Sequence, residues 1–139
     1  NTSNITTKNN VLCSCSSQLN YDQCCKIAHN SHENVQTAEQ LMRSRYSAYV
    51  LKLIDYIVET THPQKRSKNL YLEITNWIEQ PQWLNLVVVS KRFGQAEDKV
   101  GFVEFKASFL LNGKEQFMHE NSRFKKFSNK WYYFDGKLK

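Results

Sequence analysis

All four cysteines of this 139-residue chain lie in one short segment near its start. They form two pairs, Cys13-Ser14-Cys15 and Cys24-Cys25, with eight residues between the pairs. Four thiolates are a ligand set that Zn²⁺ takes in structural sites, and a tight turn that returns to a second pair can bring four sulfur atoms to one ion. The spacing therefore predicts a structural zinc site formed by Cys13, Cys15, Cys24 and Cys25.

Two disulfide bonds or four inert thiols are the alternatives to zinc. Disulfides form in oxidising compartments, and no apolar stretch typical of a secretory leader precedes Val11. A bond between the adjacent Cys24 and Cys25 would also be strained. We therefore expect zinc and a cytoplasmic location. His29 and His32 follow the cluster, but four cysteines already complete the ligand set, so we expect neither to coordinate the metal.

Composition restricts the rest of the chain to one ordinary domain. The sequence is 40% hydrophobic and 13% aromatic, which suits one main buried core and excludes a disordered chain. No apolar run exceeds four residues, whereas a spanning helix needs about 20, so we expect no membrane segment. The net charge of +6 comes from basic residues interspersed with Glu and apolar residues, and we do not expect nucleic-acid binding.

Helical patterns occupy the middle of the chain. Thr37-Ala38-Glu39-Gln40 is a capping box, in which the Thr hydroxyl and the Gln side chain satisfy free N–H groups at a helix start. Apolar residues then recur at three- and four-residue steps, which predicts a helix of about 16 residues from Ala38 with one buried face. A second short helix is expected around Tyr56, closing before Pro63, and a third at 68–79.

From Trp83 onward the apolar residues alternate with a period of two, the pattern of half-buried strands. It predicts an antiparallel meander with strands at 84–93, 100–111, 114–127 and 130–135.

Tight turns at Asn112-Gly113 and Ser128-Asn129 set the register of this meander. Counting from the first turn pairs Phe105 with Glu120 and Val103 with Ser122. Counting from the second pairs Phe124 with Tyr133 and Lys126 with Trp131. Glu120 and Ser122 are therefore expected on the apolar face of the sheet.

The order of elements predicts an α+β fold, in which the helices pack on one face of a curved antiparallel sheet behind a small zinc-knuckle motif. Such a sheet tends to enclose an apolar pocket with a few polar groups. The candidate ligand-binding residues are Arg43, Arg45, Tyr49, His62, Glu120, Ser122 and Tyr133.

The cysteine spacing at 13–25 resembles the SEC-C motif. Residues 38–50, 61–63, 120–124 and 131–136 further resemble the bacterial YchJ family. The resemblance implies a SEC-C-like zinc motif at residues 1–35, with a start that leans to disorder, and a nuclear-transport-factor-like (NTF2-like, cystatin-like) cone at 36–139 in a cytoplasmic protein. Family members commonly carry a second SEC-C motif after the cone, which this sequence does not include.

Two functions follow from these features. The favoured one is a non-catalytic binding or adaptor protein, whose zinc motif docks on a protein partner while the cone binds a small ligand or dimerises. The alternative is a lyase or isomerase that uses Glu120 as its base, with Ser122, Tyr133 and either Arg45 or His62 orienting the substrate. Glu120 has a structural interpretation as well, a buried ion pair with Arg43, Arg45 or Arg123.

Overall fold

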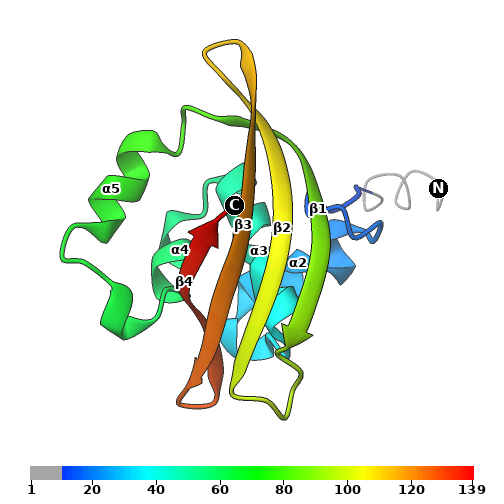
Figure 1. Cartoon of the computed structure of the whole chain (residues 1–139), viewed down its shortest axis with the longest axis vertical. Coiled ribbons are helices and arrows are strands. Elements are labelled where there is room, and N and C mark those ends of the chain that lie inside the picture. Colours follow the sequence, from blue (N-terminus) through cyan, green and yellow to red (C-terminus); the bar gives the residue numbers. More distant parts are fainter. Residues whose placement is uncertain (1–10) are drawn as a thin grey trace, which may run out of the picture.

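The computed structural model describes residues 11–139, and the leader and disorder predictions for residues 1–10 lie outside the described part. Short helical turns surround the cysteines, longer helices follow, and four strands end the chain (Figure 1). The elements are η1 (Tyr21–Gln23), α2 (Cys25–Asn30), η2 (His32–Asn34), α3 (Ala38–Leu51), α4 (Ile54–Glu59), η3 (Pro63–Lys65), α5 (Leu70–Trp77), β1 (Gln82–Phe93), β2 (Val100–Leu111), β3 (Lys114–Phe127) and β4 (Lys130–Leu138).

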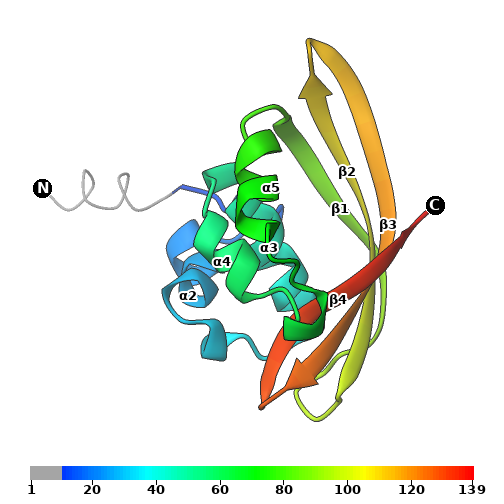
Figure 2. The ribbon, with the colours of Figure 1, turned by 90° about the vertical axis from the view of Figure 1, so that its left-hand side faces the viewer.

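The strands form one antiparallel sheet in the order β1-β2-β3-β4. The sheet is strongly curved, and the helices lie on its concave side with α3 nearest the strands (Figure 2). This arrangement confirms the predicted α+β fold. Among residues 11–139, no helix has the length and apolar character needed to cross a bilayer.

The predicted register is confirmed along β2 and β3. Leu111 faces Lys114, Phe105 faces Glu120 and Val103 faces Ser122. The second hairpin pairs Phe124 with Tyr133 as predicted. Beyond this pair the ladder shifts, and β4 continues past the predicted end at residue 135.

The capping box begins α3 as predicted. Thr37 Oγ1 accepts from the Gln40 backbone N–H at 3.1 Å, and Gln40 Oε1 accepts from the Gln36 N–H at 2.7 Å. The helix ends at Lys52, which adopts left-handed geometry with φ of 63°. The other two predicted helices are present as α4 and the slightly shorter α5.

The core lies between α3 and the sheet, with Leu41, Phe124 and Trp131 almost fully buried. Cys13, Cys15 and Cys25 belong to the same cluster of buried residues. The cysteine segment therefore packs against α3 and shares the core of the cone (Figure 2).

Candidate metal centre and cone cavity

Two local structures present the four cysteines. Cys13 and Cys15 lie on a small hairpin closed by a bridge between Leu12 and Asn20. In that hairpin the Cys13 N–H donates to the Leu19 carbonyl at 2.8 Å. Cys24 and Cys25 lie at the start of α2, which brings both pairs to one point.

The four sulfur atoms fit the size of one tetrahedral zinc ion. All four Sγ atoms lie within 4.8 Å of one another. The Sγ atoms of Cys15 and Cys24 are 3.6 Å apart, and those of Cys24 and Cys25 are 3.9 Å apart. Zinc with bonds of about 2.3 Å to sulfur would separate its ligands by about 3.8 Å. The cysteines are free thiols at distances well beyond a disulfide bond, which is about 2.05 Å.

The environment of the cluster resists four negative charges unless a cation balances them. Burial raises the pKa of Cys24 to about 11. Hydrogen bonds to Cys13 and Cys15 raise the pKa of Cys25, whereas hydrogen bonds from Cys13 and Cys25 lower the pKa of Cys15. One thiolate therefore forms readily and further ionisation is opposed. A metal ion would supply the charge that lets all four deprotonate.

Neither neighbouring histidine joins the cluster. His29 Nε2 donates to the Ser44 carbonyl at 2.8 Å, and its Nδ1 accepts from the Tyr21 hydroxyl at 2.7 Å. His32 Nε2 bonds the Trp131 carbonyl at 2.6 Å. These bonds fix α2 and η2 against the cone. The prediction concerned metal ligation alone and did not include this packing role.

On the concave side of the sheet lies a cavity of about 420 Å³. Residues from α3, the end of α5, β1 and the three following strands line it. Half of its lining residues are aromatic, including Tyr46, Tyr49, Trp77, Trp83, Phe105 and Phe109. Tyr49 stacks on Trp77 with ring centroids 5.3 Å apart, and Tyr46 meets Trp83 edge to face at 5.5 Å.

The acidic group of the cavity is Glu120. Its Oε2 accepts from Ser122 Oγ at 2.5 Å and from the Tyr133 hydroxyl at 3.3 Å. Burial, followed by the nearby Glu120 charge, raises the pKa of Tyr133, so this hydroxyl stays protonated and able to donate. The three side chains form one hydrogen-bonded group in an otherwise apolar wall.

The prediction that Glu120 forms a buried ion pair with an arginine is wrong. Among the described residues, Arg43 pairs with Glu39 at 3.0 Å, and Arg123 pairs with Asp135 on the strand pair β3–β4. The third candidate, Arg45, uses Nη1 to bond main-chain and hydroxyl oxygens around the end of α4. Each of the three arginines therefore bonds other acceptors. The Glu120 carboxylate accepts instead from the hydroxyl groups of Ser122 and Tyr133.

Five of the seven predicted pocket residues line the cavity. They are Arg45, Tyr49, Glu120, Ser122 and Tyr133.

Arg43 and His62 are the two corrections to this set. Arg43 points from α3 toward the cysteine hairpin, where Nη1 donates to the Cys15 carbonyl at 2.7 Å. His62 is buried, and its Nδ1 accepts from the Gln64 N–H at 3.1 Å, which caps η3. Its ring packs on Phe134, with centroids 5.1 Å apart. Local hydrogen bonds therefore fix both side chains outside the cavity.

The sequence interpretation missed the tryptophans of the wall. Trp77 and Trp83 enter from α5 and β1, and Trp83 also contacts Phe109 at 5.1 Å between ring centroids. The Trp83 Nε1 is buried and has no hydrogen-bond partner among residues 11–139. Alternation along 101–109 places Phe105 and Phe109 on the face of Glu120, and this signal identifies part of the wall without the tryptophans.

Comparison with known proteins agrees with the architecture. Residues 37–136 match the model of "YchJ, middle NTF2-like domain". A UPF0225 protein of Vibrio parahaemolyticus is 47% identical over 124 residues, which cover 89% of this chain and 73% of that protein.

Two solved structures of SEC-C motif containing proteins are also similar. The solution structure from Rhodopseudomonas palustris has 39% identity and a TM-score of 0.78, covering 90% of this chain and 96% of that one. The crystal structure from Psychrobacter arcticus has 33% identity and a TM-score of 0.73, covering 91% and 82%. The chain therefore belongs to the YchJ family, with a SEC-C motif ahead of an NTF2-like domain.

Proposed function

We propose that this protein is a non-catalytic binding protein, in which a structural zinc ion fixes the SEC-C motif to α3 and the cone cavity holds a small, largely apolar ligand. The observation that carries the proposal is the cavity itself, because an aromatic pocket with one convergent polar group is the usual form of a ligand site. The closed set of four sulfur ligands leaves zinc no position for a reacting water, so the metal serves structure.

Native mass spectrometry of gently purified protein tests metal and ligand together. The expected result is one zinc with four protons displaced, plus an additional small mass that survives gentle ionisation. A chain mass lower by four hydrogens with no metal bound, the signature of two disulfides, would contradict the zinc site. The same spectrum gives the subunit number, which tests whether the cone dimerises.

A second role, docking on a protein partner, is supported by the surface of the zinc motif. Four large apolar side chains around the cluster are exposed, namely Val11, Leu12, Leu19 and Ile27. Replacing Leu19 by Ser should abolish partner capture without affecting the zinc content, whereas the matched change of the exposed Leu72 on α5 should do neither. Capture that persists in the Leu19 variant would exclude this surface. A zinc–thiolate site also fits a reducing compartment, and we propose a cytoplasmic location on that ground.

The enzyme alternative rests on Glu120 and is the weaker candidate. The Glu120 carboxylate accepts hydrogen bonds from Ser122 and Tyr133 on one oxygen and leaves the other oxygen open, an arrangement that suits an anchor for a ligand. Glu120→Gln separates the two roles, because a catalytic base would lose turnover of a converted ligand, whereas an anchor would lose affinity.

A further inference from the structure

We propose that the cone cavity selects an organic cation, an amine attached to an aromatic or aliphatic body, whose ammonium group bonds Glu120 while its body lies between the aromatic walls. This inference rests on the proposed ligand-binding function and names the class of ligand. Three features of the cavity carry it: the unshared carboxylate oxygen, the aromatic lining and the engagement of the basic side chain.

The first feature is an unused acceptor. Both donors near Glu120 bond the same oxygen, Oε2, and no described residue donates to Oε1. Within the described chain no Lys, Arg or His nitrogen lies within 4.0 Å of the carboxylate. A carboxylate in an apolar pocket gains most from a charged donor, because charge-assisted hydrogen bonds are stronger than neutral ones. An ammonium group supplies both the donor and the charge.

The second feature is the wall. Eight of the lining residues are aromatic, and Glu120 is the only acidic residue among them. The face of an aromatic ring attracts a cation, and burial strengthens this attraction. The lining therefore favours a positive group next to Glu120 and an apolar body elsewhere.

The third feature concerns Arg45, the only basic residue of the lining. Its Nη1 donates to the Ile57 carbonyl at 2.9 Å, to Thr60 Oγ1 at 2.8 Å and to Thr61 Oγ1 at 3.3 Å. Its guanidinium also lies 4.7 Å from the centre of the Tyr133 ring. An anionic ligand would find Nη1 of Arg45 already bonded and would meet the Glu120 charge. The cavity therefore favours cations over anions.

A set of three probes with one body and different head groups tests the inference. They are 4-phenylbutylamine, 4-phenyl-1-butanol and 4-phenylbutanoate, titrated at pH 7 and about 0.15 M salt and followed by chemical-shift changes of the tryptophan indole N–H signals. We expect the amine to bind about tenfold more tightly than the alcohol, and the carboxylate to bind weakest. Carboxylate binding equal to or tighter than amine binding would overturn the inference while leaving the ligand-binding function intact. If none of the three binds, both fail.

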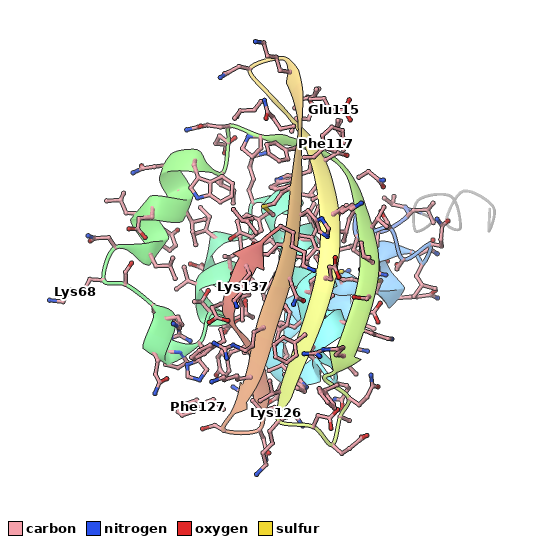
Figure 3. All side chains as sticks on the ribbon, in the orientation of Figure 1. Lys68, Glu115, Phe117, Lys126, Phe127 and Lys137 are labelled. Atoms are coloured by element: carbon pink, nitrogen blue, oxygen red, sulfur yellow. The ribbon has the colours of Figure 1, made fainter. Side chains whose placement is uncertain are left out.

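Two Glu→Gln variants locate the preference. Glu120→Gln keeps the shape of the side chain and removes the charge, so the advantage of the amine over the alcohol should fall to less than about threefold. Glu115→Gln is the matched control, because Glu115 is exposed at the β2–β3 end of the molecule (Figure 3). It lies roughly 17 Å from Glu120 along β3, which is beyond the Debye screening length of about 8 Å at 0.15 M salt. It should leave the preference unchanged. An equal loss in both variants, or none in Glu120→Gln, would overturn the inference. The probe ranking on the unmodified chain decides the question if the Glu120 variant does not fold.

Discussion

The Glu120 side chain passes over Gly136 of β4, in space that any larger residue at position 136 would fill. A Cβ atom added at Gly136 would lie 2.6 Å from Cδ and 3.0 Å from Cγ of Glu120, and closer still to its Oε2. The three nearest atoms all belong to this one side chain. Replacing Gly136 by Ala should therefore push the carboxylate away from β4 and break its hydrogen bonds with Ser122 and Tyr133.

The cost of this displacement follows from those two bonds. Ser122 is only 2% exposed, so its hydroxyl has no access to water once the acceptor moves. A buried hydroxyl that loses its partner costs about 1–3 kcal/mol, and the longer bond from Tyr133 adds less. Replacing Gly by Ala stabilises by about 0.5 kcal/mol through the unfolded chain, which offsets part of the loss. We expect a net loss of about 2 kcal/mol in the free energy of unfolding.

A double-mutant cycle separates this cause from general strain in β4. The four proteins are the unmodified chain, Gly136→Ala, Glu120→Ala and the double variant, unfolded in urea with zinc present and followed by tryptophan fluorescence. In the Glu120→Ala background all three clashing atoms are absent, so Gly136→Ala should stabilise by about 0.5 kcal/mol, and the coupling energy should be about 2.5 kcal/mol. Lys137→Ala, at the exposed neighbouring position, should change stability by less than about 0.5 kcal/mol. An equal cost of Gly136→Ala in both backgrounds would refute the reasoning.

Three further predictions concern other parts of the molecule. Arg45→Met should lower the unfolding free energy by about 3 kcal/mol in the same urea assay, because it removes three hydrogen bonds made by one buried, charged donor. Cys24→Ser should remove zinc, which native mass spectrometry would show. It should also lower the melting temperature measured by circular dichroism, because the other three cysteines lie in the main core. Retained zinc would exclude Cys24 as a ligand. Burial lowers the pKa of His32 in the folded state, so its contribution to stability is complete above the unfolded value of about 6.5 and is lost as the pH falls below it. His32→Gln should flatten the decline of urea stability between pH 7.5 and 5.5; an unchanged slope would assign the decline to other groups.

The register of β2 and β3 could be predicted because two constraints agree. The Asn112-Gly113 turn sets which residues face one another, and the alternation of 101–109 sets which face is buried. A slip of one residue would have moved every apolar side chain to solvent. The grouping of the four cysteines was also predictable. Four thiols within one short segment can bind one metal ion, form disulfides or stay free, and few other arrangements are open to them.

The errors about α3 have a different origin. The helix pattern predicted one buried face, but the helix has two. Met42, Arg45 and Tyr49 line the cavity, whereas Ser44 and Ser47 are buried toward the cysteine segment. Small polar residues gave no sign that a second layer covers them. The sequence therefore could not show that Arg43 belongs to the metal side of the helix.

The surroundings of Glu120 depend on a feature that turn counting cannot detect. Counting back from the pair Phe124–Tyr133 would place Asp135 opposite Ser122 and a second carboxylate beside Glu120. The ladder instead shifts by one residue after Phe124, so that Ser122 faces Gly136 and Arg123 faces Asp135. The shift gives Asp135 a partner, with Arg123 Nε donating to its Oδ1 at 2.8 Å. It also puts the residue without a side chain under the carboxylate. A bulge in β4 thus removes a competing charge and makes room for Glu120, and a strand without it would leave this residue no stable position in the cavity.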